Sequence, residues 1–123
     1  MSNPFSEDPT ISTDRISPRH VFEARIQVRL VRSGKSVTLQ GWARDLSESG
    51  LAAFVADVLG LGDLVILEIP LATSAMQTIP AKVIRALGTE YGFQFTALSA
   101  EQRKQIRSTL LGHPTIPYRG PAE

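Results

Sequence analysis

Hydrophobic and polar positions alternate with a period of two along much of this chain, beginning at residue 22. Within an expected strand at residues 22–32, the apolar side chains occupy every second position of residues 22–30: Phe22, Ala24, Ile26, Val28 and Leu30. This period is typical of an antiparallel strand with one buried face. Ser-Gly-Lys at 33–35 then predicts a hairpin turn.

Five further segments have strand character and are separated by short turns: residues 36–46, 50–56, 63–71, 77–87 and 90–97. Gly41 interrupts the alternation of the first of these, so we expect a bulge there. Pro80 has no N–H to donate to a neighbouring strand and predicts an edge or the start of a strand. The alternation of Tyr91, Phe93 and Phe95 predicts a core-facing row.

Residues 99–111 have a helical pattern instead. Ser99 and Gln102 fit a capping box, and Gly112 suits the C-terminal cap. The apolar stripe expected along this helix consists of Ile106, Leu110 and Leu111.

Six short strands and one terminal helix predict an all-β domain, either a small antiparallel barrel or a sandwich. We place this domain at residues 14–112. Residues 1–13 are rich in Ser, Pro and Asp without periodicity, which predicts a flexible arm. Residues 113–123 predict a loose C-terminal tail.

Composition narrows the classes of function. The chain has 13 Lys and Arg against 12 Asp and Glu, so no bulk charge attracts DNA, RNA or a membrane surface. It has no cysteine, which excludes disulfides and thiolate metal sites. The N-terminus lacks the basic and apolar regions of a secretory signal, and no apolar run is long enough to span a membrane. These features predict a cytoplasmic protein.

An enzyme is not indicated. His20 and His113 are the only histidines, and neither stands at a spacing typical of metal ligands or of a catalytic pair. Two solvent-exposed or structural histidines are the simpler interpretation. We therefore expect no catalytic residue, no metal and no cofactor.

Two polar clusters are candidates for a binding site. In the first, Arg15 and Arg19 stand four residues apart, just before the first strand. Guanidinium groups bind phosphate and guanine and stack on base planes, although two solvated arginines on a linker would have the same sequence. Pro18 restricts the residue before it to extended geometry.

The second cluster is Asp-Leu-Ser-Glu-Ser-Gly at residues 45–50. As a simple turn, Asp45 and Ser47 would bond their own backbone and Gly50 would take a positive φ. As half of a site, the Asp45 carboxylate can accept two hydrogen bonds from a guanine edge. The Ser47 hydroxyl and backbone N–H groups can hold phosphate oxygens.

Together these clusters resemble the two-part signature of PilZ domains, R-x-x-x-R followed by [D/N]-x-S-x-x-G. The first half is residues 15–19 and the second is residues 45–50, and the resemblance covers about residues 14–111. It implies a six-stranded antiparallel barrel with a C-terminal α-helix, and binding of cyclic di-GMP, a bacterial second messenger with two guanines and two phosphates.

The resemblance also implies roles for individual residues. The ligand-binding residues carried over are Arg15, Arg19, Asp45, Ser47 and Gly50. The possible additional contacts are Asp14, His20, Arg44 and Ser49. Many members have a further arginine where this chain has Asp14, and some have a polar residue where it has Ala52. The carboxylate at Asp14 favours one ligand per chain over a stacked pair.

The expected protein is a stand-alone cyclic di-GMP receptor, not an enzyme, in which the ligand orders the arginine arm and an unidentified protein partner recognises the result. We expect a monomer or weak dimer. Two alternatives remain open: a PilZ-like interaction module that binds no nucleotide, and a small barrel that binds single-stranded nucleic acid. The second requires a basic groove with exposed aromatic residues, and Trp42 is the only tryptophan.

Overall fold

The computed structural model of the chain describes residues 17–72 and 75–116. The expected arm and the residues Asp14 and Arg15 lie outside these described residues. The strands and the helix are β2 (His20–Arg32), β3 (Lys35–Leu46), β4 (Gly50–Val55), β5 (Leu64–Pro70), β6 (Met76–Leu87), β7 (Glu90–Phe95) and α2 (Ala100–Leu111). Each begins and ends within two residues of the range expected from the hydrophobic pattern.

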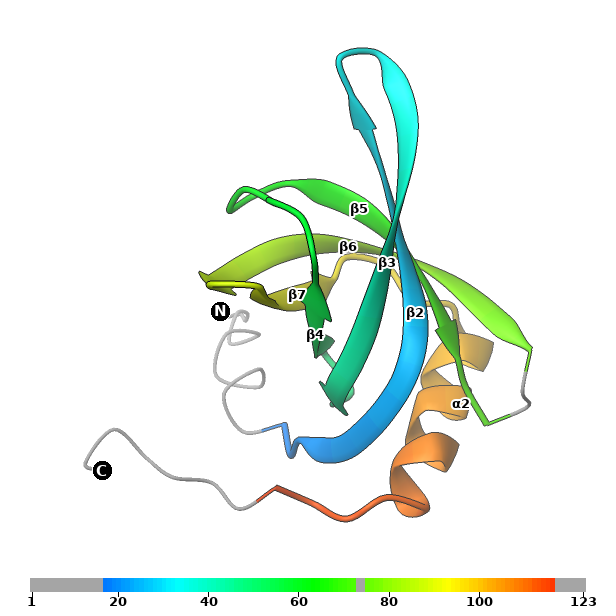
Figure 1. The fold of residues 1–123 in the computed structure, drawn as a ribbon. Coiled ribbons are helices and arrows are strands. Elements are labelled where there is room, and N and C mark those ends of the chain that lie inside the picture. The colour runs from blue at the N-terminus through cyan, green and yellow to red at the C-terminus, as the bar shows by residue number, and fades with distance from the viewer. Residues whose placement is uncertain (1–16, 73–74, 117–123) are drawn as a thin grey trace, which may run out of the picture.

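The six strands form one closed barrel in the order β2-β3-β4-β7-β6-β5 (Figure 1). Every neighbouring pair is antiparallel, and the pairing of β2 with β5 closes the barrel. Closure leaves no long open edge to pair with another chain. The all-β prediction is confirmed, and the fold is a barrel and not a sandwich.

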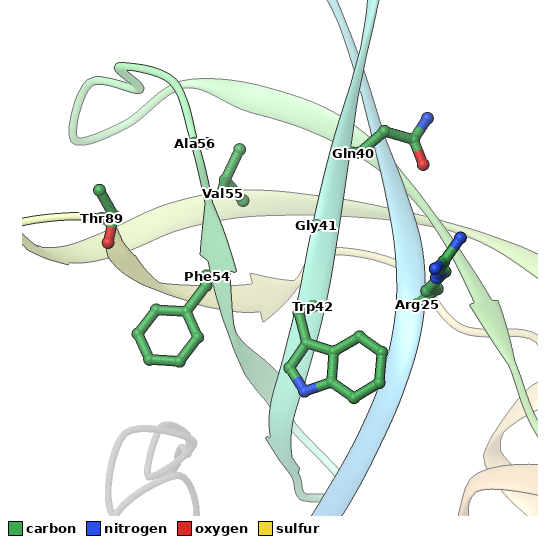
Figure 2. Close-up of a pocket in the computed structure, with 8 residues that line it drawn as sticks. All are labelled: Arg25, Gln40, Gly41, Trp42, Phe54, Val55, Ala56 and Thr89. Carbon is green, nitrogen blue, oxygen red and sulfur yellow. The ribbon is translucent and has the colours of Figure 1, made fainter.

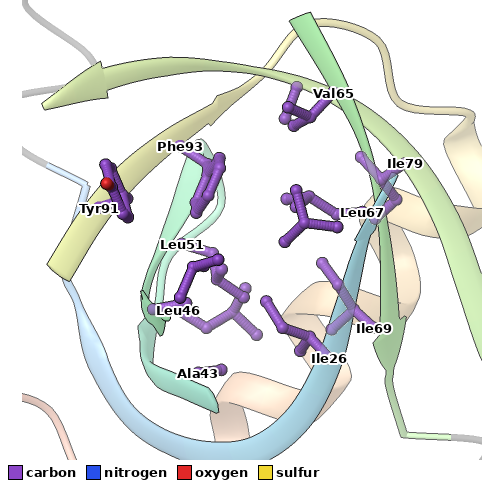
Figure 3. Close-up of a cluster of buried hydrophobic side chains, with 14 of the residues drawn as sticks. Ile26, Ala43, Leu46, Leu51, Val65, Leu67, Ile69, Ile79, Tyr91 and Phe93 are labelled. Carbon is purple, nitrogen blue, oxygen red and sulfur yellow. The ribbon is translucent and has the colours of Figure 1, made fainter. Parts of the chain in front are cut away.

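The inward side chains of the strands fill the barrel with an apolar core. Figure 3 shows part of this cluster, which includes Ile26, Leu46, Leu67, Ile79 and Phe93. At most 2% of the surface of each of these five residues is exposed, so the interior is closely packed where the structure describes it. Polar groups that form a binding site are therefore expected on the outer wall or at the ends of the barrel.

Gly41 is not at a bulge, contrary to the sequence expectation. It stands in regular register with its neighbours on both sides, one of which is Ile26. A Cβ at this position would lie 3.1 Å from the Ile26 Cγ1 and 3.2 Å from the Phe54 carbonyl oxygen, so close packing favours glycine. The bulge lies two residues further along, between Ala43 and Asp45.

Pro80 is neither at an edge nor at the start of its strand. It lies inside β6, opposite Ile66 of β5. Its carbonyl accepts a 2.9 Å hydrogen bond from the Thr96 N–H, just beyond the end of β7. The N–H and C=O of one strand residue point to the same side. The position of the missing N–H of Pro80 therefore faces Thr96, which lies just beyond the end of β7. Proline at this position removes no hydrogen bond between β6 and β7.

The terminal helix has the predicted capping box. The Ser99 hydroxyl accepts a 3.0 Å hydrogen bond from the Gln102 N–H, and the Gln102 side chain accepts a 3.1 Å bond from the Ser99 N–H. Gly112 is the C-terminal cap, as expected. No helix in the described part of the chain is long and apolar enough to cross a membrane.

The apolar stripe of α2 differs from the prediction at one position. Ile106 and Leu110 are buried in the core, but Leu111 is 89% exposed. Leu111 follows Ile106 by five positions, about 140° around the helix axis, so it points away from the barrel. Thr109 takes the place on the buried face, and its hydroxyl donates a 2.9 Å hydrogen bond to the carbonyl of Gln105.

Candidate ligand-binding site

The two sequence clusters meet on the surface of the barrel. Arg19 Nη2 donates a 2.7 Å hydrogen bond to Asp45 Oδ2, and Arg19 Nε donates a 3.3 Å bond to Asp45 Oδ1. The hydrogen bond to Asp45 raises the pKa of Arg19, against an opposing effect of partial burial. The Arg19 side chain is 47% exposed and that of Asp45 only 9%. The carboxylate is thus held beneath a guanidinium that still faces solvent.

A β-bulge places Asp45 on the outside of the barrel. Ala43 and Leu46 belong to the core, and in a regular strand Asp45 would share the inward face of Ala43. The register with β4 instead pairs Ala43 and Asp45 with consecutive residues, so Arg44 is the extra residue of the bulge. Extra residues of this kind re-aim side chains. Here the bulge turns a carboxylate outward that would otherwise lie unpaired among apolar side chains.

Ser47 uses its polar atoms to build the turn after β3. Ser47 is buried, with 6% of its surface exposed. Its hydroxyl accepts 3.2 Å hydrogen bonds from the N–H groups of Ser49 and Gly50. The Ser47 N–H donates a 2.9 Å bond to the Gly50 carbonyl. The Ser49 hydroxyl lies 3.2 Å from that of Ser47. These bonds fit the turn interpretation, and a direct contact of Ser47 or Ser49 with a ligand remains a prediction.

Gly50 does not have the positive φ that the turn interpretation requires. It is the first residue of β4 and lies against β7. A Cβ at Gly50 would lie 2.1 Å from the carbonyl oxygen of Phe93, well inside van der Waals contact distance. The glycine of the motif therefore permits two backbones to approach. Its role as a ligand contact stays a prediction.

The segment after the helix is not loose where the structure describes it. The Val21 N–H donates a 2.8 Å hydrogen bond to the Pro114 carbonyl, and the Ile116 N–H donates a 2.7 Å bond to the Arg19 carbonyl. His20 Nδ1 lies 2.9 Å from the carbonyl oxygen of His113. Residues 113–116 thus pair with the backbone that carries Arg19. The expectation of a loose tail is wrong for these four residues.

Both histidines have structural partners. The His113 Nδ1 lies 2.8 Å from the Thr109 carbonyl oxygen, and its ring packs edge-on against Phe22 with centroids 5.6 Å apart. His20 is bound to the tail through the contact with His113. The structural interpretation of the histidines fits these contacts, and a contact of His20 with a ligand stays a prediction.

Two aromatic rings stand outside the barrel next to this site. Trp42 of β3 and Phe54 of β4 are directly paired across the strands, and they are 42% and 38% exposed. The Arg44 guanidinium lies over the Phe54 ring, 5.0 Å from its centroid. Figure 2 shows both rings beside one another on β3 and β4, with Arg25 on the neighbouring strand. These three residues help to line an open groove of about 380 Å³. Sequence analysis missed Phe54, because the run of apolar residues at 51–55 has no alternation.

A second cation lies further along the outer wall. One cross-strand row consists of Asp45, Ala52, Gly92 and Arg85. A Cβ on Gly92 would lie 3.7 Å from the Arg85 Cζ, so the guanidinium covers the glycine. Among the described residues Arg85 has no hydrogen bond or ion pair, and its charge is available to an anion.

Sequence analysis did not single out Arg85, because a regular strand would turn residues 83 and 85 to the same face. The structure has a bulge between Val83, which is buried, and Arg85, which is exposed. A bulge therefore stands at each end of the row. The only sign of this bulge in the sequence is that the alternation of apolar and polar residues breaks down at residues 83–87.

Comparison with known proteins identifies the family. The PilZ domain family matches residues 13–112 of the sequence. The fold is similar to the PilZ domain of CeSA from a cellulose-synthesizing bacterium, with a TM-score of 0.59 and 22% identity over 76% of this chain and 95% of that one. It is also similar to the PilZ domain, with c-di-GMP, of YcgR from Escherichia coli, with a TM-score of 0.63 and 16% identity over 80% of this chain and 89% of that one.

No curated protein matches the chain in sequence. At 16% and 22% identity the two solved structures establish the fold alone. The match to the family covers most of the chain, including both halves of the motif and every strand. The resemblance found in the sequence is confirmed, and the chain belongs to the PilZ domain family.

Proposed function

We propose that this protein is a bacterial cytoplasmic receptor for cyclic di-GMP that acts as an adaptor and not as an enzyme. The observation that carries the proposal is the bidentate contact between Arg19 and Asp45 on the outer wall of the barrel. These residues are 26 positions apart and belong to the two halves of the PilZ motif. Their meeting brings a phosphate-binding cation and a guanine-reading carboxylate into one site.

The ligand chemistry fits the charges of this wall. Cyclic di-GMP carries two phosphates and two guanines. Arg19 and Arg85 offer half-exposed or exposed guanidinium groups, and Arg15 precedes them in the sequence. Asp45 presents two acceptor oxygens, which match the N1–H and N2–H of a guanine edge. Binding replaces the contact between Arg19 and Asp45 by contacts of each with the ligand, so no charge is left unpaired.

In this mechanism the ligand acts by ordering the arm. This arm extends beyond residues 1–13 to include the segment that carries Arg15 and Arg19, which leads into β2 at His20. Phosphates held by Arg15 and Arg19 draw the arm against the wall beside Asp45, which forms a new surface. A protein partner that recognises this surface transmits the signal. The prediction is that amide hydrogen exchange of residues 14–19 slows when the ligand is added.

Calorimetric titration of the full chain with cyclic di-GMP tests the proposal. We expect saturation near one equivalent, and at least about a tenfold loss of affinity in Arg19→Ala, because a charged hydrogen bond contributes about 1.5–3 kcal/mol. Arg103→Ala is the matched control, since Arg103 is an exposed arginine of α2. The proposal fails if the wild-type chain releases no heat and shows no binding by a second method.

A second titration, which compares two cyclic dinucleotides, separates the roles of Asp45 and Arg19. Asp45→Ala should weaken cyclic di-GMP much more than cyclic di-AMP, because adenine presents a different edge to the carboxylate. Equal losses for both ligands would mean that Asp45 only supports Arg19.

A further inference from the structure

The exposed ring pair on the outer wall needs a physical explanation. Trp42 and Phe54 are adjacent across β3 and β4, and each leaves more than a third of its surface in water. Large aromatic side chains usually bury most of their area, and contiguous exposed ones mark binding surfaces. The groove that they line is shallow and open, with a volume of about 380 Å³.

Two cations flank the rings. Arg25 stands opposite Trp42 on β2 and lines the groove, and the Arg44 guanidinium lies over the Phe54 ring. Neither arginine has an ion pair among the described residues. Flat rings with unneutralised guanidinium groups beside them suit a ligand that is both aromatic and anionic, which is the chemistry of a nucleotide.

The ring pair lies close to the motif site on the same strands, although the motif residues do not line the groove itself. Arg44, the extra residue of the bulge, directly precedes Asp45. Trp42 stands three residues before Asp45 on β3, a separation of about 10 Å along a strand. A compact dinucleotide, whose two bases are joined through two sugars and two phosphates, spans this distance. One base at Asp45 therefore leaves the other within reach of the rings.

We infer that the groove at Trp42 and Phe54 takes the second guanine of the cyclic dinucleotide, which stacks on the indole ring while Asp45 reads the first. This inference rests on the proposed function. Stacking needs only a ring face, so this subsite tolerates any base, whereas the carboxylate selects guanine. Arg44, held by Phe54, lies between the two bases and faces the phosphates that join them.

An acidic protein segment is the other occupant that two arginines and two rings suit. The nucleotide is favoured because Arg44, which lies over the Phe54 ring, directly precedes Asp45, so the rings stand within the span of one dinucleotide from the carboxylate. A protein segment would not require this closeness.

The single tryptophan makes the test direct. Cyclic di-GMP is titrated into the full chain while heat and Trp42 emission are followed together. We expect the emission to be quenched with the same midpoint as the heat. Trp42→Ala and Phe54→Ala should bind at least about fivefold more weakly, and Trp42→Phe should stay within about threefold of wild type. Val31→Ala, an exposed apolar residue near the far end of the β2–β3 hairpin, should change nothing.

The outcomes distinguish this inference from the proposed function. Binding by the wild type with unchanged affinity in both alanine variants overturns the inference alone, and assigns the rings to a protein surface. Absence of binding in the wild type overturns the proposed function and the inference with it. Circular dichroism confirms that each variant is folded, and because both rings are exposed we expect little loss of stability.

Discussion

The contact between Arg19 and Asp45 can be measured without any ligand, through a double-mutant cycle on stability. The carboxylate is 9% exposed and the guanidinium 47% exposed, so removal of either partner has a different cost. Arg19→Ala leaves a desolvated carboxylate without a partner among the described residues. Asp45→Ala leaves a guanidinium that water can still reach. The arginine variant should therefore be the less stable of the two.

The magnitudes follow from the geometry. An unpaired, largely buried polar group costs about 1–3 kcal/mol, and we expect about 2 kcal/mol for Arg19→Ala. The exposed arginine left by Asp45→Ala should cost about 0.5–1 kcal/mol. The double variant should resemble Asp45→Ala, because it no longer contains a buried charge. The coupling energy then equals the cost of Arg19→Ala, about 2 kcal/mol.

Thermal and urea unfolding of the four proteins supply the measurement. For about 100 ordered residues the entropy of unfolding is about 0.2 kcal/mol/K, so 1 kcal/mol corresponds to roughly 5 °C in Tm. Arg19→Ala should unfold about 10 °C below wild type. If the two single variants lose equal stability and their effects simply add, the ion pair does not hold Asp45 in solution and the reasoning is wrong.

Three other expectations follow from the structure. Gly50→Ala brings a Cβ to 2.1 Å from the Phe93 carbonyl oxygen and should cost about 2 kcal/mol or more in urea unfolding, whereas Gly60→Ala meets no atom closer than 3.4 Å and should be nearly neutral. Truncation after residue 112 removes the backbone bonds to residues 19–21, and should weaken cyclic di-GMP binding about three- to tenfold in calorimetry. The hydrogen bond from the Val58 N–H, and after it the one from Arg32, lower the pKa of Asp57. The stability that these bonds contribute is fully present above the ordinary pKa of the carboxyl group and is lost as the pH falls through the lowered pKa. An NMR titration in which the pKa of Asp57 is not lowered would contradict these contacts.

The sequence was sufficient for the bounds of the strands, because turn signals separate them and most show period-two alternation, although β4 shows none. It was also sufficient for the helix start, since the capping box at Ser99 and Gln102 is a local pattern. It failed at Leu111, where counting apolar residues ignored the angle around the helix axis. The closed barrel came from the resemblance, and the order of the strands was not predicted, because alternation does not say which strands are neighbours.

The errors at the site share a physical cause, which is that the decisive contacts join distant parts of the chain. Gly50 is required by the Phe93 carbonyl of β7, and no local turn signal contains that information. The pairing of residues 113–116 with residues 19–21 crosses more than 90 positions. The motif could be recognised in the sequence because it combines specific residue types at a fixed spacing. The physical reason for each residue is visible only in its contacts with neighbouring strands.

The two bulges explain how a packed barrel presents chemistry on its wall. A regular strand through Ala43 or Val83 would send Asp45 or Arg85 into the core, where a charge is costly. One extra residue in β3 and another in β6 turn both charges outward, at the two ends of a row whose middle positions are Ala52 and Gly92. The small middle residues leave room for side chains to lie over the wall, as the Arg85 guanidinium does over Gly92. The interior thus remains apolar and stable while the outer wall gains the charges that an anionic ligand requires.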